Sequence, residues 1–114
     1  MVDIKTIKEG EILMMNIVGD VDASSSIELD TALQAAIESK EEKILVDCNN
    51  LNYISSAGLG VFMSYIQDIN ANDIKMVICG LNEKVHNVFE ILGLHQLLTI
   101  KATTAEAKEY LSEV

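Results

Sequence analysis

The chain opens with a strand-like pattern of side chains. Val2 to Ile7 alternates apolar and polar residues, residues 8–11 are typical of a turn, and Ile12 to Val18 is an apolar run interrupted only by Asn16. Two such segments joined by a short polar turn predict a β-hairpin. We therefore expect the fold to begin with two antiparallel strands.

The rest of the chain alternates between short apolar runs and helical spacing. Residues 43–47 and 74–79 are rich in β-favouring side chains, and residues 97–100 can form a further short strand. Apolar residues recur every three or four positions, as a helix face requires, in four sets: Leu29, Leu33, Ala36 and Ile37; Leu59, Phe62, Ile66 and Ile69; Val85, Val88, Phe89 and Leu92; and Ala107 with Leu111. The predicted order ββαβαβα(β)α indicates an α/β fold, a mixed β-sheet of four to five strands with helices packed against it.

Residues typical of helix ends mark the boundaries of these segments. Ser25 with Glu28, and Thr103 with Glu106, have the S/T-x-x-E spacing of a capping box. Gly93 follows the third helical set, where a C-terminal cap is expected. The first and last predicted helices should therefore begin with a capping serine or threonine.

Size and charge narrow the classes of protein. A length of 114 residues favours one domain, residues 1–114, with a sizeable core. Eight lysines, no arginine and eighteen acidic residues give a net charge of −10. Nucleic-acid binding needs a cationic surface, so this balance argues against a nucleic-acid partner. An acidic surface favours partners that present Lys or Arg, and the expected partner is another protein.

The sequence carries no sign of export, membrane insertion or a metal site. The first ten residues lack the apolar core of a secretory signal, and no apolar run approaches the ~18 residues of a spanning helix. Cys48 and Cys79 are isolated, and His86 and His95 are nine positions apart, outside metal-ligand spacing. We expect a reduced, cytoplasmic protein that is not an enzyme and uses no metal or cofactor.

The segment Ser55-Ser56-Ala57-Gly58-Leu59-Gly60 combines hydroxyls and glycines at a predicted strand-to-helix junction. A serine there serves as a helix N-cap, accepting a hydrogen bond from a backbone N–H. The same geometry also suits a phosphoserine, because the helix N-terminus stabilises an added negative charge. Residues alone leave both roles open. Asp20 and Asp22 can likewise have a purely structural role, in which they cap and solvate the loop before the first helix.

Three segments resemble the STAS domain family. Tyr53 to Val61 reads YISSAGLGV and is similar to the family signature, Gly19-Asp20-Val21-Asp22 resembles its G-x-[LIV]-D after the second strand, and Leu45-Val46-Asp47 resembles its acidic strand end. The resemblance covers essentially the whole chain. It is to the free-standing bacterial members, the anti-sigma factor antagonists.

The resemblance implies a regulatory switch. In such antagonists the unphosphorylated form binds an anti-sigma factor that is also a serine kinase, and the sigma factor is released. Phosphorylation ends that complex, and a PP2C-type phosphatase resets it. Carried over by position, the acceptor is Ser56, with Ser55 as the fallback. The residues implied near the acceptor and the partner are Asp20, Asp22, Asp47, Ser55, Gly58, Leu59 and Gly60.

Two positions depart from the family pattern. The acidic residue usual before the acceptor is Ser55, and the small hydroxyl residue that often follows is Ala57. The alternative function is a constitutive STAS scaffold or accessory subunit, in a stress-signalling or lipid-transport complex, in which Ser56 only caps the helix. The sequence leaves the oligomeric state open, with a monomer as the expectation.

Overall fold

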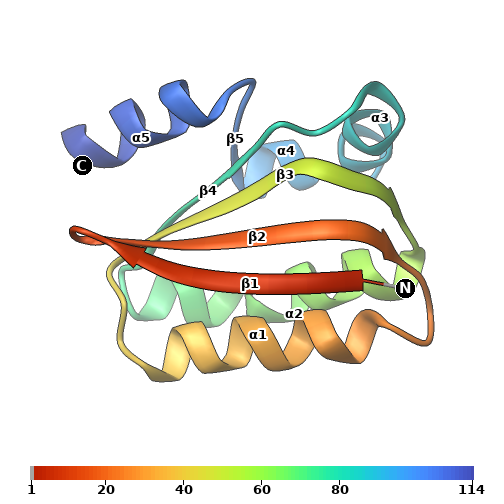
Figure 1. The fold of residues 1–114 in the computed structure, drawn as a ribbon, viewed down its shortest axis with the longest axis horizontal. Coiled ribbons are helices and arrows are strands. Elements are labelled where there is room, and N and C mark those ends of the chain that lie inside the picture. The colour runs from red at the N-terminus through yellow and green to blue at the C-terminus, as the bar shows by residue number, and fades with distance from the viewer. Residues whose placement is uncertain (1) are drawn as a thin grey trace.

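The computed structural model describes residues 2–114. One twisted sheet carries five strands in the spatial order β1-β2-β3-β4-β5 (Figure 1). Their bounds are Val2–Glu9, Ile12–Val21, Lys43–Ile54, Lys75–Cys79 and Thr99–Lys101. The helices are α1 (Ser26–Glu38), α2 (Ser56–Ala71), α3 (Glu83–Ile91), α4 (Leu94–Leu97) and α5 (Thr104–Glu113). The predicted α/β fold with a mixed sheet is confirmed.

The sheet joins one hairpin to a parallel core. β1 pairs antiparallel with β2 through a turn at Gly10, whose φ of +60° suits a residue without a side chain. β2, β3, β4 and β5 run parallel to one another. Each parallel step needs a crossover, and helices supply it. The carboxyl ends of β2 and β3 therefore meet at one edge of the sheet, where α1 and α2 begin.

Side-chain alternation along the central strands divides the helices between two faces. Ile44, Val46 and Ile78 point into the main core, which also holds the buried side chains of α1, α2, α3 and α4. Leu45, Val77 and Cys79 form a smaller core with Ala107 and Leu111 of α5. Because successive strand residues point to opposite faces, α5 covers the face opposite to α1 and α2 (Figure 1).

The pair α1 and α2 is also joined by a polar contact. The two helices lie side by side on the sheet (Figure 1). The Tyr65 hydroxyl of α2 donates a hydrogen bond to the Asp30 carboxylate of α1, and this bond raises the pKa of Tyr65 to about 12. This bond joins the first half of α1 to the second half of α2.

The structure differs from the sequence predictions in several places. β3 continues to Ile54 rather than ending near Asp47, because residues 48–54 keep pairing with β2 across two register shifts. The short helix α4 was not predicted, and Leu92 is half-exposed rather than packed. The Ser25 capping box was wrong: the Ser25 side chain accepts the Asp22 N–H at 2.9 Å and caps no helical N–H. Thr103 does cap its helix, accepting the Glu106 N–H at 3.1 Å.

Candidate functional site

The first turn of α2 is fastened to the ends of two strands. β3 ends at Ile54, which pairs with Val21, the last residue of β2. Ser55 is extended, with φ −82° and ψ 170°, and its N–H donates to the Val21 carbonyl at 2.8 Å. The helix then begins at Ser56. This junction places both serines at the edge of the sheet where α1 also begins.

The two adjacent serines have different roles in the fold. Ser55 is the N-cap, half-buried, and its Oγ accepts the Gly58 N–H at 3.2 Å. Ser56 is the first helical residue, and it is exposed. Within residues 2–114 no side-chain hydrogen bond engages its hydroxyl. The N–H groups of Ser56 and Ala57 belong to the first helical turn, which has no carbonyl partner inside the helix. A group on the Ser56 oxygen would therefore meet open donors and the positive end of α2.

The two glycines of the signature are also unlike each other. A Cβ on Gly58 would lie 2.7 Å from Ile54 Cγ1 and 2.8 Å from Val21 Cγ1. A Cβ on Gly60 would meet nothing within 4 Å. Gly58 therefore allows the helix backbone to sit directly on the strand ends. Leu59, between them, is buried in the main core and anchors the same turn.

Asp22 organises the neighbouring loop. Its carboxylate accepts hydrogen bonds from the Ser24 hydroxyl at 2.8 Å and the Ser25 N–H at 2.8 Å, and the Ser25 hydroxyl lies 2.9 Å away. These bonds, that from Ser24 first, lower the pKa of Asp22 to about 2. Asp22 is thus a fixed negative charge at the start of α1. Asp20 is exposed on β2, opposite Tyr53 of β3.

Asp47 lies apart from this group. It occupies the middle of β3, paired with Asn16 and Cys79, and its Oδ1 accepts from the Asn49 N–H at 2.9 Å and the Asn49 side-chain amide at 2.7 Å. It lies seven positions before Ile54, or roughly 20 Å of strand at the usual rise per residue. The structure brings together Asp20, Asp22, Ser55, Ser56, Gly58, Leu59 and Gly60 at one edge, and it separates Asp47 from them.

Two exposed apolar side chains belong to the same edge and were missed in the sequence. Tyr53 is 52% exposed, two positions before Ser55, and Ile27 is 67% exposed in the first turn of α1. Ile27 could have been found from its position, because it lies off the apolar face that Leu29 and Leu33 define. Tyrosine is among the residue types enriched where protein partners make their strongest contacts.

The remaining reactive residues form no second centre. Cys48 and Cys79 are buried, and burial raises the pKa of both thiols. His86 Nδ1 lies 2.8 Å from Glu90 Oε1 on the surface of α3. Among residues 2–114, no group of three or more His, Cys, Asp or Glu side chains is arranged to hold a metal ion. None of the helices described is long and apolar enough to cross a membrane.

Comparisons with known proteins agree on the fold. The anti-sigma-B factor antagonist of Staphylococcus aureus (strain NCTC 8325 / PS 47) is 28% identical over 102 residues, 90% of this chain and 94% of the relative. The crystal structure of an anti-sigma factor antagonist from Mycobacterium paratuberculosis superposes with a TM-score of 0.88 at 12% identity, covering 96% of this chain and 93% of that one. The Bacillus cell fate determinant SpoIIAA in its phosphorylated form gives 0.71 at 17% identity, covering 97% and 99%.

At such identities the two structures establish the fold alone. The family follows from the sequence itself, because the model of the STAS domain matches residues 3–107. That match includes the strand ends, the Asp20–Asp22 loop and the first turn of α2. The chain belongs to the STAS domain family.

Proposed function

We propose that this chain is an anti-sigma factor antagonist controlled by phosphorylation of Ser56. The unphosphorylated form binds an anti-sigma factor with serine kinase activity and so frees the sigma factor. Phosphate on Ser56 ends the complex, and a PP2C-type phosphatase restores it. Staphylococcal relatives named anti-sigma-B factor antagonists support this role, which is that of a regulatory binding protein rather than an enzyme. Phosphorylated SpoIIAA, a structural neighbour, supports the mode of control.

The observation that carries the proposal is the difference between Ser55 and Ser56. The Ser55 hydroxyl is half-buried and accepts the Gly58 N–H, so a kinase would have to break the helix cap to reach it. The Ser56 hydroxyl is exposed at the first position of α2. This favours Ser56 as the phosphate acceptor and gives Ser55 the role of helix cap.

Electrostatics supplies a mechanism that leaves the fold intact. A phosphate adds about −1.5 to −2 charges, and a helix N-terminus is a favourable place for it. The same charge faces the partner beside Asp20 and Asp22, on a protein whose net charge is already −10. A partner surface that tolerates the Ser56 hydroxyl then meets a solvated dianion. The complex is weakened at the contact itself, with no refolding required.

Incubation with ATP and a candidate anti-sigma kinase, followed by intact mass and phosphopeptide mapping, tests the assignment. We expect one added phosphate in the parent and in Ser55→Ala, and none in Ser56→Ala. A phosphate mapped to Ser55 or Ser64 contradicts the assignment. Tight partner binding with no phosphate on any serine favours the constitutive scaffold instead.

A further inference from the structure

The two edges of the sheet are protected to different degrees. β5 is a three-residue edge strand, too short to template a partner strand. β1 has eight residues, and its register with β2 runs without a bulge from Val2 to Glu9. An unbulged edge presents a regular row of backbone donors and acceptors. The β1 edge is therefore the one able to accept another strand.

A groove lies beside that edge, between β1 and α1. One part, of about 570 Å³, is lined by Val2, Ile4, Ile27, Thr31 and Ala35, among others. A second part, of about 380 Å³, shares Ile4, Ala32 and Ala35 with the first and continues toward Ser39. The side of α1 that faces the groove carries mostly small side chains. Because these side chains are small, side chains from another segment can enter the groove and pack against α1.

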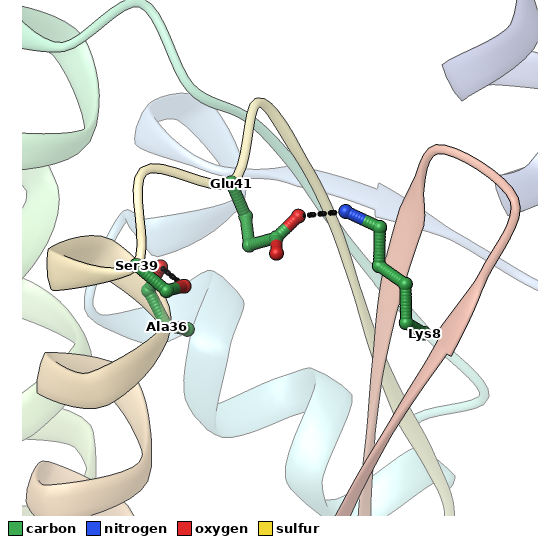
Figure 2. A network of polar contacts seen from close by, with 4 residues as sticks. All are labelled: Lys8, Ala36, Ser39 and Glu41. Carbon is green, nitrogen blue, oxygen red and sulfur yellow. Dashed lines mark hydrogen bonds and ion pairs between the residues drawn. The ribbon is translucent and has the colours of Figure 1, made fainter.

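The groove is closed at one end. Lys8, at the hairpin end of β1, forms an ion pair with Glu41 from the loop between α1 and β3 (Figure 2). On the same side, the Ser39 hydroxyl bonds back to the Ala36 carbonyl at 2.8 Å. The groove is thus open beside residues 2–6 of β1.

We infer that this edge pairs with the same edge of a second copy of the chain, related by a two-fold axis at Ile4. Antiparallel pairing about a two-fold axis perpendicular to the sheet places equivalent faces on the same side. Centred on Ile4, the register sets Ile4 opposite Ile4, Val2 opposite Thr6, and Asp3 opposite Lys5. Residues 2–6 are all paired in this register.

Charge selects this register over its neighbours. Asp3 and Lys5 are both exposed, with 65% and 74% of their side chains accessible, and they lie 3.9 Å apart on one chain. In the dimer they alternate with the same pair from the second copy, so each charge lies opposite its counter-charge. A two-fold centred on Lys5 would oppose Lys5 to itself, and one centred on Thr6 would oppose Asp3 to Glu9.

The position of α1 also fits a second copy. α1 contacts both β1 and β2, so it lies over the boundary between them. With strands about 4.8 Å apart, a mate of α1 would lie roughly 10 Å away, the distance at which helices pack. The two helices would run antiparallel across their small side chains, with Glu28 of each far from Glu28 of the other. Sheet pairing and helix packing are thus satisfied by one arrangement, independently of the proposed function.

Light scattering and sedimentation of the full chain from about 1 to 500 µM test the inference. We expect a concentration-dependent dimer. Lys5→Asp should weaken its association about tenfold, because both symmetry-related pairs become repulsive. The double variant Asp3→Lys, Lys5→Asp should restore it. Lys84→Asp, the same change of charge on exposed α3, is the matched control and should leave the dimer nearly unchanged.

Three results overturn the inference. The parent could remain a monomer throughout, which would leave the edge to a foreign segment. The double variant could fail to restore a dimer that Lys5→Asp has weakened. Lys84→Asp could weaken the dimer as much as Lys5→Asp, which would trace the effect to net charge. Far-ultraviolet circular dichroism of each variant establishes that the fold is intact.

Discussion

The starts of α1 and α2 are two versions of the same junction. Each helix follows a parallel strand, and each has a serine at the N-cap and another at the first helical position: Ser25 and Ser26 in α1, Ser55 and Ser56 in α2. In α1 the Asp22 carboxylate occupies the turn, receiving the Ser25 N–H and the Ser24 hydroxyl. In α2 the Ser55 hydroxyl caps Gly58, and no carboxylate precedes it.

The third helical position differs as well. It is exposed Glu28 in α1 and buried Gly58 in α2, so the first turn of α1 stands at the surface and that of α2 sits on the strand ends. The start of α1 thus carries the negative charge of Asp22. The start of α2 has no carboxylate, so its positive end is available to an added phosphate. A phosphorylation switch requires two features: a first helical turn packed firmly against the sheet, and free N–H groups at the helix N-terminus.

The largest expected effect comes from a carboxylate placed at the open start. Ser56→Asp should weaken binding to the anti-sigma partner by about 2 kcal/mol or more, because a carboxylate at the centre of the contact loses its hydration when the complex forms. Its stability should stay within about 1 kcal/mol of the parent, the size of a cap or dipole effect. Calorimetric titration and urea unfolding measure both quantities.

Asn87→Asp is the matched control for that variant, since it adds the same charge on exposed α3, and its partner affinity should remain that of the parent. If Ser56→Asp binds as tightly as the parent, or loses binding only because it unfolds, the electrostatic switch is wrong. Ser56 would then have a purely structural part in the helix start.

An intermediate effect, on the free energy of unfolding, should distinguish the two glycines Gly58 and Gly60 in the first turns of α2. Gly58→Ala should lower the free energy of unfolding by about 1–2 kcal/mol, since overpacking against Ile54 and Val21 outweighs the gain in helix propensity. Gly60→Ala should raise it by up to about 1 kcal/mol, because its added methyl group meets open space. Urea unfolding curves of both variants decide this. Equal effects of the two substitutions would contradict the close packing of Gly58 against the ends of β2 and β3.

The smallest effect concerns the charge already present at α1. The pKa of Asp22 is lowered to about 2 in the folded protein, below the ordinary value of 3.8. A carboxyl with a depressed pKa stabilises the fold above its unfolded pKa, and this contribution is lost as pH falls toward the folded value. Asp22→Asn should therefore reduce the loss of stability between about pH 4 and pH 2. Thermal unfolding across that range measures it, and curves that stay parallel would show that Asp22 is not the group responsible.

Much of this architecture could be predicted because it depends on neighbours in the chain. The alternation in residues 2–18 predicted the hairpin, and helical spacing placed Leu29, Leu33, Phe62 and Phe89 in the core, where they are buried. Gly93 ends α3 with a φ of +74°, as its place in the sequence indicated. Thr103 caps α5 through a residue three positions away. The spacing of apolar residues, the glycine that ends a helix and the threonine that caps one all depend on residues a few positions apart in the chain.

The roles of the serines could not be predicted in the same way. Ser25 and Ser55 both precede a helix, yet only Ser55 caps one, because Asp22 competes for Ser25 and the Val21 carbonyl holds Ser55 extended. The length of β3 depended on pairing too: its asparagines disfavour a strand, and β2 provides the ladder that keeps them in one. That extension is also what carries Asp47 away from the site.

The sequence by itself thus determined the order of elements, the α/β class and the segment that carries the chemistry, since these follow from side-chain period and residue type. Only the tertiary structure decided which hydroxyl is exposed, which glycine is sterically required and which acidic residues share an edge. Those properties depend on atoms of β2 brought against β3 and α2, which lie more than thirty positions further along the chain. Contacts over such separations are set by packing and register, and no local pattern encodes them.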